Sequence, residues 1–371
     1  MNKTLIIFSY DFPPSNGGIA RLCQEIAVGQ QINFEHVIVL TRIKIGENKP
    51  YNFDKVQVIE LPQKRIKCER VAFSYLQNIK NKEEYTILCG VWHPEAALSI
   101  LAGFKNIYIL GHGTEFLSGI SKFRKYFWLP IYAKWVLGRA KMNIANSNYT
   151  KKLIEKINKK GNVIALPLGV NEDFFKPNEV LKENKDILKI ASVSRILKFK
   201  GYDFIARTIA NLPIDFKNKI QWNIGGTGDY LENLKQLVKV LGIENNVTFH
   251  DFIPDLELPA FYNTNDIFVL CTRELENSTS VEGFGLVFLE AQSCGIPVIG
   301  VRSGGIPDAI EEGNGGWLIE QDNEQMLADL FINLIQNQEL VKNEGLKARK
   351  RIIQKANWKH YNEKLFKIIT N

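Results

Sequence analysis

Short, largely apolar runs recur along the whole chain, and stretches with a helical apolar pattern separate several of them. Continuous apolar character, rather than strict alternation, is typical of parallel strands that are buried on both faces. The runs are Thr4–Ser9, Val37–Leu40, Val56–Leu61, Thr86–Cys89, Ile107–Leu110, Met142–Ala145, Val163–Leu166, Leu188–Val193, Trp222–Ile224, Val247–His250, Ile267–Cys271 and Pro297–Val301. Their alternation with helices predicts an α/β fold with doubly wound, mostly parallel sheets.

A length of 371 residues exceeds what one hydrophobic core usually supports, so the sequence predicts two domains. The Lys-, Asn- and Glu-rich stretch Lys176–Lys185 is expected to link them. The five cysteines are scattered without a Cys-x-x-Cys pair, which favours a reducing cytoplasm over a zinc site or a disulfide framework. No uncharged apolar run reaches the roughly 18 residues of a membrane span, and the run at the start is too short for a signal segment.

Charge is unevenly placed along the chain. Residues 1–170 hold 24 Lys and Arg against 12 Asp and Glu, whereas residues 171–371 hold 23 against 28. The basic half suggests an anionic partner, which could be a membrane surface, a phosphorylated acceptor or nucleic acid, and a solvated face is the alternative. Within Ser121–Lys141, basic residues interleave with Trp, Tyr and Phe, which suits an interfacial helix on anionic lipid as well as an ordinary core helix. No nucleic-acid recognition pattern is present, so we expect no nucleic-acid partner.

Two loops of the first half follow predicted strands and could contact a ligand. Gly17 and Gly18 lie between the first strand and a helix, which is a geometry for close approach to phosphate. The spacing of a dinucleotide-binding G-x-G-x-x-G fingerprint is absent. His112 stands between two glycines at another strand end and is either a site residue or a structural histidine.

Strand-end loops of the second half repeat this pattern with charged residues. Arg195 and Lys200 lie between a strand and a helix, where a guanidinium fork and an ammonium suit a diphosphate. Gly226 and Gly228 form a glycine-rich turn after the next strand. The backbone of residues 251–254 could read the edge of a base. Each of these features alone could be an ordinary exposed loop.

The stretch from Glu282 to Glu290 places one glutamate on a glycine-containing loop and the other inside the helix that follows. The N–H groups at such a helix start suit phosphate, whereas ionised carboxylates accept hydrogen bonds from sugar hydroxyls. We therefore expect a ligand that carries phosphate and sugar together. Two carboxylates alone would also suit a general acid/base pair for sugar hydrolysis, but a hydrolase needs no convergence of phosphate-binding loops.

Taken in order, these motifs resemble those of glycosyltransferase family 4 over essentially the whole chain. They are Gly17-Gly18, His112, Ser147–Thr150, Arg195 with Lys200-Gly201, Gly226–Gly228, Glu282–Glu290 and Gly304-Gly305. The two glutamates with Phe-Gly between them are the most specific element. One departure is Asp251-Phe252, where the family often has a glycine, and this leaves the base of the donor unassigned.

The resemblance implies a retaining enzyme with the B-type glycosyltransferase fold, in which two Rossmann-like domains face each other across a cleft. The implied domains are an acceptor-binding domain of residues 1–172, with the C-terminal helix of 356–371 crossing back to it, and a donor-binding domain of residues 173–355. The implied catalytic residues are His112, Arg195, Lys200 and Glu282. The implied donor-binding residues are Gly17, Gly18, Gly226, Gly228, Ile253, Phe284, Gly285, Leu286 and Glu290. No catalytic metal and no cofactor are expected besides the nucleotide-sugar co-substrate.

The expected function is transfer of a hexosyl unit from a UDP- or GDP-sugar to a glycan or lipid-linked acceptor in cell-surface polysaccharide or lipopolysaccharide biosynthesis. The expected location is the cytoplasm, peripheral on the inner face of the plasma membrane, with the first domain on the anionic lipid. Two alternatives remain open from the residues. The same fold could act on a small soluble acceptor, or the chain could be a nonenzymatic nucleotide-sugar-binding protein.

Overall fold

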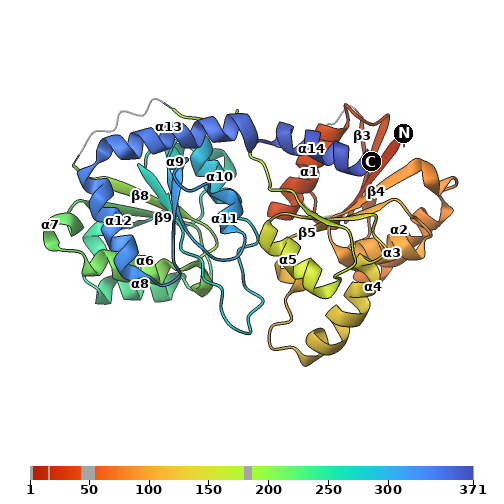
Figure 1. Cartoon of the computed structure of the whole chain (residues 1–371), viewed down its shortest axis with the longest axis horizontal. Coiled ribbons are helices and arrows are strands. Elements are labelled where there is room, and N and C mark those ends of the chain that lie inside the picture. Colours follow the sequence, from red (N-terminus) through yellow and green to blue (C-terminus); the bar gives the residue numbers. More distant parts are fainter. Residues whose placement is uncertain (1–2, 16, 43–54, 179–185, 371) are drawn as a thin grey trace. The chain divides into compact units, whose positions relative to one another are not determined.

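The computed structural model describes residues 3–15, 17–42, 55–178 and 186–370 (Figure 1). Residues 179–185 of the predicted linker lie outside the described residues. The chain divides into two compact units. Unit 1 comprises Met1–Leu168, Asn277–Thr279 and Trp358–Asn371, and unit 2 comprises Gly169–Glu276 and Ser280–Asn357.

Unit 1 is built on a parallel sheet whose strand order is β3-β2-β1-β4-β5-β6-β7. The strands are β1 (Thr4–Phe8), β2 (His36–Arg42), β3 (Val56–Leu61), β4 (Tyr85–Cys89), β5 (Ile107–Gly111), β6 (Met142–Ala145) and β7 (Val163–Ala165). The order reverses between β1 and β4, and ligands of doubly wound sheets bind outside the carboxyl ends of the strands at such a switch point.

Helices of unit 1 connect and cover these strands. They are α1 (Gly18–Gln30), α2 (Arg65–Asn78), η1 (Lys82–Glu84), η2 (Trp92–Ala96), α3 (Ala97–Leu101), η3 (Thr114–Phe116), η4 (Arg124–Ala133), α4 (Lys134–Leu137), α5 (Asn148–Ile157) and α14 (Trp358–Thr370). The last helix, α14, packs on the first, since Nε2 of Gln30 donates to both oxygens of Asn362 at 2.9 Å. Nearby, the rings of Phe34 and Phe366 meet edge to face. The C-terminal helix therefore belongs to the first unit, as the family resemblance implies.

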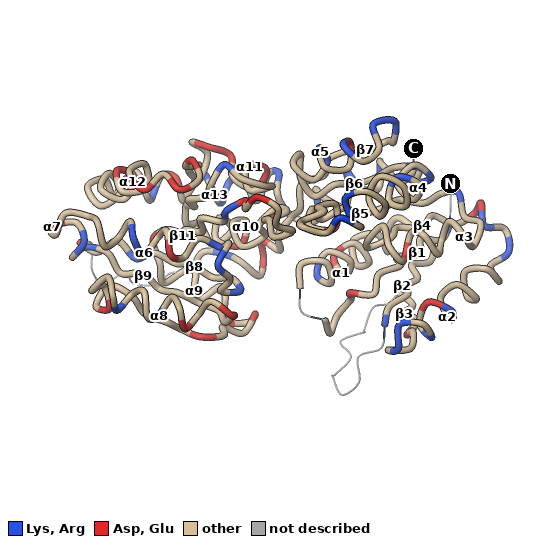
Figure 2. The backbone as a smooth tube through the Cα atoms, turned by 90° about the horizontal axis from the view of Figure 1, so that it is seen from below, with Lys and Arg blue, Asp and Glu red and all other residues tan. Residues whose placement is uncertain are grey.

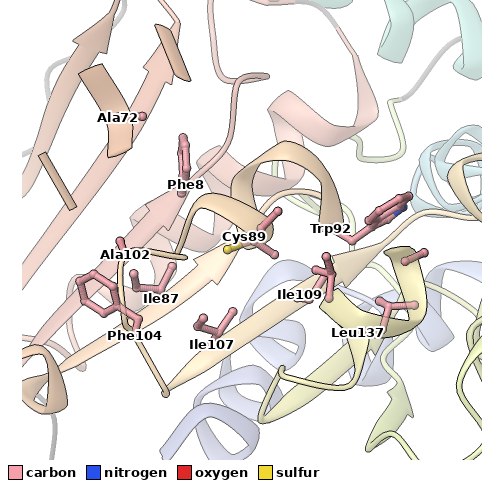
Figure 3. Packing of buried hydrophobic residues seen from close by; sticks show 14 of the residues in the cluster. Phe8, Ala72, Ile87, Cys89, Trp92, Ala102, Phe104, Ile107, Ile109 and Leu137 are labelled. Carbon is pink, nitrogen blue, oxygen red and sulfur yellow. The ribbon is translucent and has the colours of Figure 1, made fainter. Parts of the chain in front are cut away.

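A hydrophobic cluster of unit 1 lies between the sheet and its covering helices. Figure 3 shows Phe8, Ile87, Cys89 and Ile107 on the strands, with Ala72 of α2 at one side of the cluster. The strand residues of this group are fully buried, and apolar burial of this kind is the dominant favourable term in folding. The cluster fixes the strand ends from which the candidate residues of unit 1 project.

Unit 2 repeats the doubly wound pattern in a parallel sheet of order β10-β9-β8-β11-β12-β13. Its strands are β8 (Leu188–Val193), β9 (Ile220–Gly225), β10 (Val247–Phe249), β11 (Ile267–Val269), β12 (Val298–Val301) and β13 (Gly316–Ile319). Its helices are η5 (Lys198–Lys200), α6 (Tyr202–Asn211), α7 (Ile214–Lys217), α8 (Leu231–Val240), η6 (Glu244–Asn246), η7 (Asp255–Glu257), α9 (Leu258–Asn263), α10 (Leu286–Ser293), α11 (Ile306–Ala309), α12 (Glu324–Gln336) and α13 (Gln338–Lys355). The order reverses between β8 and β11, which is the switch point of this unit.

The predicted fold class of two doubly wound α/β units with parallel sheets is confirmed. One strand, β13, was missed, because its apolar part is only three residues long and directly follows a glycine-rich turn. Figure 2 shows Lys and Arg on the turn between α5 and β7, and Asp and Glu on α12, in line with the basic first half and acidic second half. Among the described residues, no helix is both long and apolar enough to cross a membrane.

Candidate active site

The candidate residues of unit 2 gather at its switch point. The loop after β8 carries Arg195 and Lys200, and the loop after β11 leads to Glu282 at the start of α10. Because β8 and β11 are neighbouring parallel strands, both loops leave the same edge of the sheet. The strand order therefore brings these two loops to one edge of the sheet.

Lys200 and Glu282 contact each other directly. Nζ of Lys200 donates to Oε2 of Glu282 at 2.6 Å. The two side chains are 13% and 17% exposed, so the pair is shielded from water yet still reachable by a ligand. A charge-assisted hydrogen bond of this length orients both groups, with the ammonium and the carboxylate presented side by side.

Two glycines allow the loops that carry Lys200 and Glu282 to approach neighbouring backbone closely. Gly201 follows Lys200 with a φ of 78°, and a Cβ there would collide with the carbonyl oxygen of Cys271 at the end of β11. Gly304, with a φ of 53°, leaves no room for a Cβ beside the carbonyl oxygen of Glu282. That same oxygen accepts a hydrogen bond from the backbone N–H of Gly305 at 2.8 Å. Only glycine combines positive φ with such close backbone approach.

Helix α10 begins immediately beside this pair. Gly285 precedes its first residue with a φ of 93°, and Phe284 is buried behind it. Leu286 is the first helical residue, so the positive end of the helix lies next to Glu282. Such a helix start suits the negative charge of a phosphate group.

Glu290 lies one turn into α10 and is only 4% exposed. Its Oε2 accepts a hydrogen bond of 2.9 Å from the hydroxyl of Tyr262, which is itself fully buried. A carboxylate offers about four acceptor positions on its two oxygens, and the Tyr262 hydroxyl uses one of them. The contact fixes the orientation of the carboxyl group.

Arg195 is exposed at the rim of the same edge, and within the described ranges its side chain makes no ion pair or hydrogen bond. The neighbouring loop is fixed by Gly226, whose φ is 120° and whose Cβ would collide with the carbonyl oxygen of Ser194. The N–H of Ile196 donates to Thr227 at 2.9 Å, which joins the loop after β8 to the loop after β9. Arg195 is thus an exposed cation on a loop whose backbone is fixed by hydrogen bonding and close packing.

The segment after β10 completes the group. Gly226 donates its N–H to the carbonyl oxygen of Asp251 at 2.5 Å, so Gly226 and Gly228 lie in a turn joined to this segment. Asp251 has a φ of 49°, the left-handed region that aspartate tolerates better than most residues. A glycine would adopt this conformation without steric strain. The side chain of Ile253 packs against Gly225, which leaves its backbone at the loop surface.

Sequence reasoning missed Arg273, which ties these loops together. Its backbone N–H donates to the carbonyl oxygen of Phe199 at 2.7 Å. Its guanidinium donates to Oδ1 of Asp203 at 2.7 Å and to Oδ1 of Asp322 at 2.5 Å. The side chain is 16% exposed, so these bonds join η5, α6 and the turn after β13 in a shielded position. In the sequence, a single arginine in a polar loop gives no signal of this role.

The remaining candidates lie in unit 1. His112 follows β5, and its Nε2 lies 2.7 Å from the carbonyl oxygen of Gly90. Because a carbonyl only accepts, Nε2 carries the proton, and this contact fixes the tautomer of a neutral ring with Nδ1 as its acceptor. Gly17 and Gly18 lie at the start of α1, and a Cβ added at Gly17 would meet nothing within 4 Å. The structure thus holds His112 firmly but shows no close approach that requires glycine at position 17.

Among the described residues, no cluster of His, Cys, Asp or Glu could hold a metal ion. The prediction that catalysis needs no metal stays a prediction.

Comparison with known proteins adds to this geometry. Residues 172–357 match the family model described as Glycosyl transferases group 1. The chain is 27% identical over 336 residues, 85% of each sequence, to the GDP-mannose-dependent alpha-(1-6)-phosphatidylinositol monomannoside mannosyltransferase of Mycolicibacterium smegmatis.

Two solved structures share the fold. Sucrose-phosphate synthase from Thermosynechococcus elongatus superposes with a TM-score of 0.77 at 19% identity, covering 99% of this chain and 98% of that one. HepE from Anabaena, solved in complex with UDP-glucose, superposes with a TM-score of 0.75 at 18% identity over 99% of each chain. At such identities the likeness shows the fold alone.

Proposed function

The chain belongs to the glycosyl transferases of group 1, and on that premise we propose that it moves a hexosyl unit, with retention, from a nucleotide-diphosphate sugar to a glycan or lipid-linked acceptor. Family membership and the structural neighbours confirm the predicted hexosyltransferase and the predicted B-type glycosyltransferase fold. The retaining outcome, the acceptor and the residue roles belong to the proposal. So does its place in cell-surface polysaccharide or lipopolysaccharide biosynthesis.

The observation that carries the proposal is the contact between Lys200 and Glu282 beside the start of α10. It offers a cation and a helix N-terminus for phosphate, with a carboxylate next to them for hydroxyls. A nucleotide sugar carries a diphosphate and sugar hydroxyls close together. It can therefore contact the cation, the helix N-terminus and the carboxylate at the same time.

In the proposed reaction, Lys200 and Arg195 bind the diphosphate and stabilise the negative charge that grows on it as the bond from the anomeric carbon breaks. The acceptor oxygen forms its bond to that carbon on the same face. The proton of the acceptor hydroxyl passes to the departing phosphate oxygen. Glu282 orients the hydroxyls of the transferred sugar rather than attacking the anomeric carbon, and Glu290 accepts from the ribose hydroxyls. A role for His112 of unit 1 in the transfer is part of the proposal.

The test begins with the donor. The purified protein is screened by thermal shift against UDP-, GDP- and ADP-sugars, since a ligand that binds only the folded state raises its stability. The stabilising donor is then incubated with protein and water, and nucleoside diphosphate release is measured. Slow release supports an enzyme, whereas stabilisation without any release favours the nonenzymatic alternative. The anomeric configuration of the sugar product, read by NMR, tests retention.

We extend the proposal to a membrane-bound acceptor and a peripheral position on the cytoplasmic face of the plasma membrane. The mycobacterial relative is named for a phosphatidylinositol-linked acceptor. In this chain, η4 and the turn before it expose large apolar side chains, namely Ile120, Phe123, Tyr126, Phe127 and Ile131 at 58–89%. Exposed Lys122, Lys125 and Lys134 accompany them. Apolar residues flanked by lysines suit insertion into the surface of an anionic bilayer.

Cosedimentation with vesicles tests this surface. The variant with Phe123→Ser and Phe127→Ser should lose binding to vesicles of phosphatidylcholine with phosphatidylglycerol. A matched variant, Ile32→Ser, also removes a highly exposed apolar side chain of unit 1 but should bind as the parent does. Equal binding by all three proteins would show that η4 is not the membrane contact, and no binding by any of them would favour the alternative of a small soluble acceptor.

A further inference from the structure

The switch point of unit 1 holds a group of polar residues with no role assigned so far. Tyr10 follows β1, Arg42 ends β2, and Glu95 lies in η2 just after β4. These three strands are neighbours in the order β2-β1-β4, so their carboxyl ends form one continuous edge. The corresponding edge of unit 2 carries the donor residues, and ligands of doubly wound sheets bind at this position.

Glu95 is buried and incompletely paired. The residue is 2% exposed, and its Oε1 accepts from the backbone N–H of Tyr10 at 3.2 Å. In the described part of the chain, its Oε2 has no hydrogen-bond partner. Burial raises the pKa of Glu95 to about 8, and the charge of Arg42 lowers it by less. Glu95 therefore keeps its proton at neutral pH.

Arg42 is a half-buried cation with no carboxylate partner in the described ranges. Its guanidinium lies 5.0 Å from the centre of the Tyr10 ring, which supports it by a cation–π contact. Because Glu95 keeps its proton, this buried carboxyl group does not cancel the charge of Arg42. An arginine fork held on an aromatic ring without a counter-charge suits a multi-oxygen anion.

Two other basic side chains near this edge, Arg65 and His93, already have partners. Nε of Arg65 donates to Oε1 of Glu69 at 2.8 Å. Nη2 of Arg65 lies 3.3 Å from Nε2 of His93, and since arginine only donates, this nitrogen accepts. Nδ1 of His93 then carries the proton and donates to the hydroxyl of Tyr132 at 2.9 Å. Burial and the charge of Arg65 lower the pKa of His93, so this ring adds no positive charge beside that of Arg42.

We propose that the carboxyl ends of β1, β2 and β4 form an anion subsite in which Arg42 binds a phosphate group carried by the acceptor. Tyr10 positions the guanidinium, and the protonated Glu95 does not neutralise the positive charge of Arg42. The inference rests on the proposed function, in which the first unit takes the acceptor. The phosphate could belong to a lipid headgroup or to a soluble phosphorylated glycan.

Calorimetric titration with inorganic phosphate and with glycerol 3-phosphate tests the subsite. The full chain carries Lys200→Ala, so that the proposed donor site contributes less. Adding Arg42→Met should weaken phosphate binding about tenfold or more, the scale of one charge-assisted contact. Arg70→Met removes an exposed arginine of α2 and should leave binding within about twofold. Equal weakening by both variants, or no phosphate binding by the parent, would overturn the proposal.

The Glu95→Gln variant gives an independent measurement if Arg42→Met does not fold. Glutamine imitates the protonated carboxyl, so this variant should bind phosphate at pH 7 as the parent does. As pH rises through about 8, Glu95 ionises beside Arg42 and phosphate binding by the parent should fall, whereas that of Glu95→Gln should not. Identical pH profiles for the two proteins would remove Glu95 from the subsite.

The neighbouring cysteines, Tyr10 and His93 do not produce this profile. The other groups that act on the cluster are Asp11, Cys23, Cys68, Glu69 and His93. Burial raises the pKa of Cys23 to about 12 and raises those of Cys68 and Tyr10, so these groups stay neutral near pH 8. The lowered pKa of His93 keeps that ring neutral as well.

Vesicles separate the two sources of phosphate. If Arg42→Met also weakens binding to phosphatidylcholine vesicles that contain phosphatidylglycerol, the anion is a lipid headgroup. If vesicle binding is unchanged while glycerol 3-phosphate binding falls, the anion is part of a soluble acceptor. Both results support the subsite. If the protein releases no nucleoside diphosphate from the donor, the proposed transferase activity is contradicted. The binding measurements on the anion subsite remain valid in that case.

Discussion

Nζ of Lys200 donates to Oε2 of Glu282 at 2.6 Å across 82 positions of sequence. In the ligand-free protein these two candidate residues therefore neutralise each other. A diphosphate would compete with Glu282 for the ammonium, and sugar hydroxyls would replace the ammonium as donors to the carboxylate. The ion pair keeps both side chains ordered before the donor arrives. Donor binding then exchanges this pair for two sets of contacts.

Lys200→Ala should reduce kcat by about 10²-fold or more, because it removes a cation from the group on which charge develops. Lys198→Ala is the matched control, since Lys198 lies in the same short helix but is exposed. Steady-state kinetics with the identified donor measures both variants. A similar small effect for the two lysines would contradict the assignment of Lys200 to the diphosphate.

Gly201→Ala should destabilise unit 2 and disable transfer, because the new Cβ would collide with the backbone of Cys271. Gly242→Ala separates this collision from backbone strain. Gly242 also has a positive φ, of 65°, but a Cβ there meets nothing within 4 Å, so we expect a loss of only about 1 kcal/mol. Chemical denaturation compares the two variants, and equal losses would show that no close approach is needed at Gly201.

Glu290→Gln should mainly raise the KM for the donor, by about tenfold, since an amide accepts more weakly from ribose hydroxyls than a carboxylate does. The hydroxyl of Tyr262 can still donate to the amide oxygen, so the fold should tolerate the change. Initial rates over a range of donor concentrations separate KM from kcat. A large loss of kcat at saturating donor would instead place Glu290 in the chemistry.

Glu95→Gln should stabilise unit 1 increasingly as the pH rises from about 5 to 8. The pKa of Glu95 is higher in the folded protein than in the unfolded chain. The stability that its protonated form contributes to the parent is therefore fully present below the unfolded pKa. This stability is lost as the pH rises from the unfolded to the folded pKa, whereas Glu95→Gln does not titrate. The loss approaches about 1.4 kcal/mol per pH unit. Denaturation of both proteins at pH 5 and pH 8 measures the difference, and a pH-independent gap would mean that Glu95 is ionised in the folded state.

The strands were largely predictable because burial on both faces leaves a continuous apolar signature. The run Leu188–Val193 was predicted with the bounds that β8 has. The loops of Lys200 and Glu282 were also found, because their residue types suit a ligand. Their direct contact was not, since it depends on the adjacency of β8 and β11.

Residues whose partners lie far away along the chain were not identified from the sequence. Arg273 pairs with Asp203 and Asp322, which lie 70 and 49 positions away. Glu95 is an acidic residue, a type that is usually exposed, yet tertiary packing leaves it only 2% exposed. Burial and pairing of this kind are decided by the whole fold, which no local pattern encodes.

The position of α14 has a consequence for the order in which this protein is made. Trp358, Tyr361, Leu365 and Ile369 of this helix are buried in unit 1, whose first strand begins at Thr4. Domains usually fold from the N-terminus as the ribosome releases them. Here the unit synthesised first stays incomplete until the last residues of the helix emerge, after all of unit 2. A nascent chain stalled before Trp358 would therefore display the bare face of α1 to chaperones and proteases.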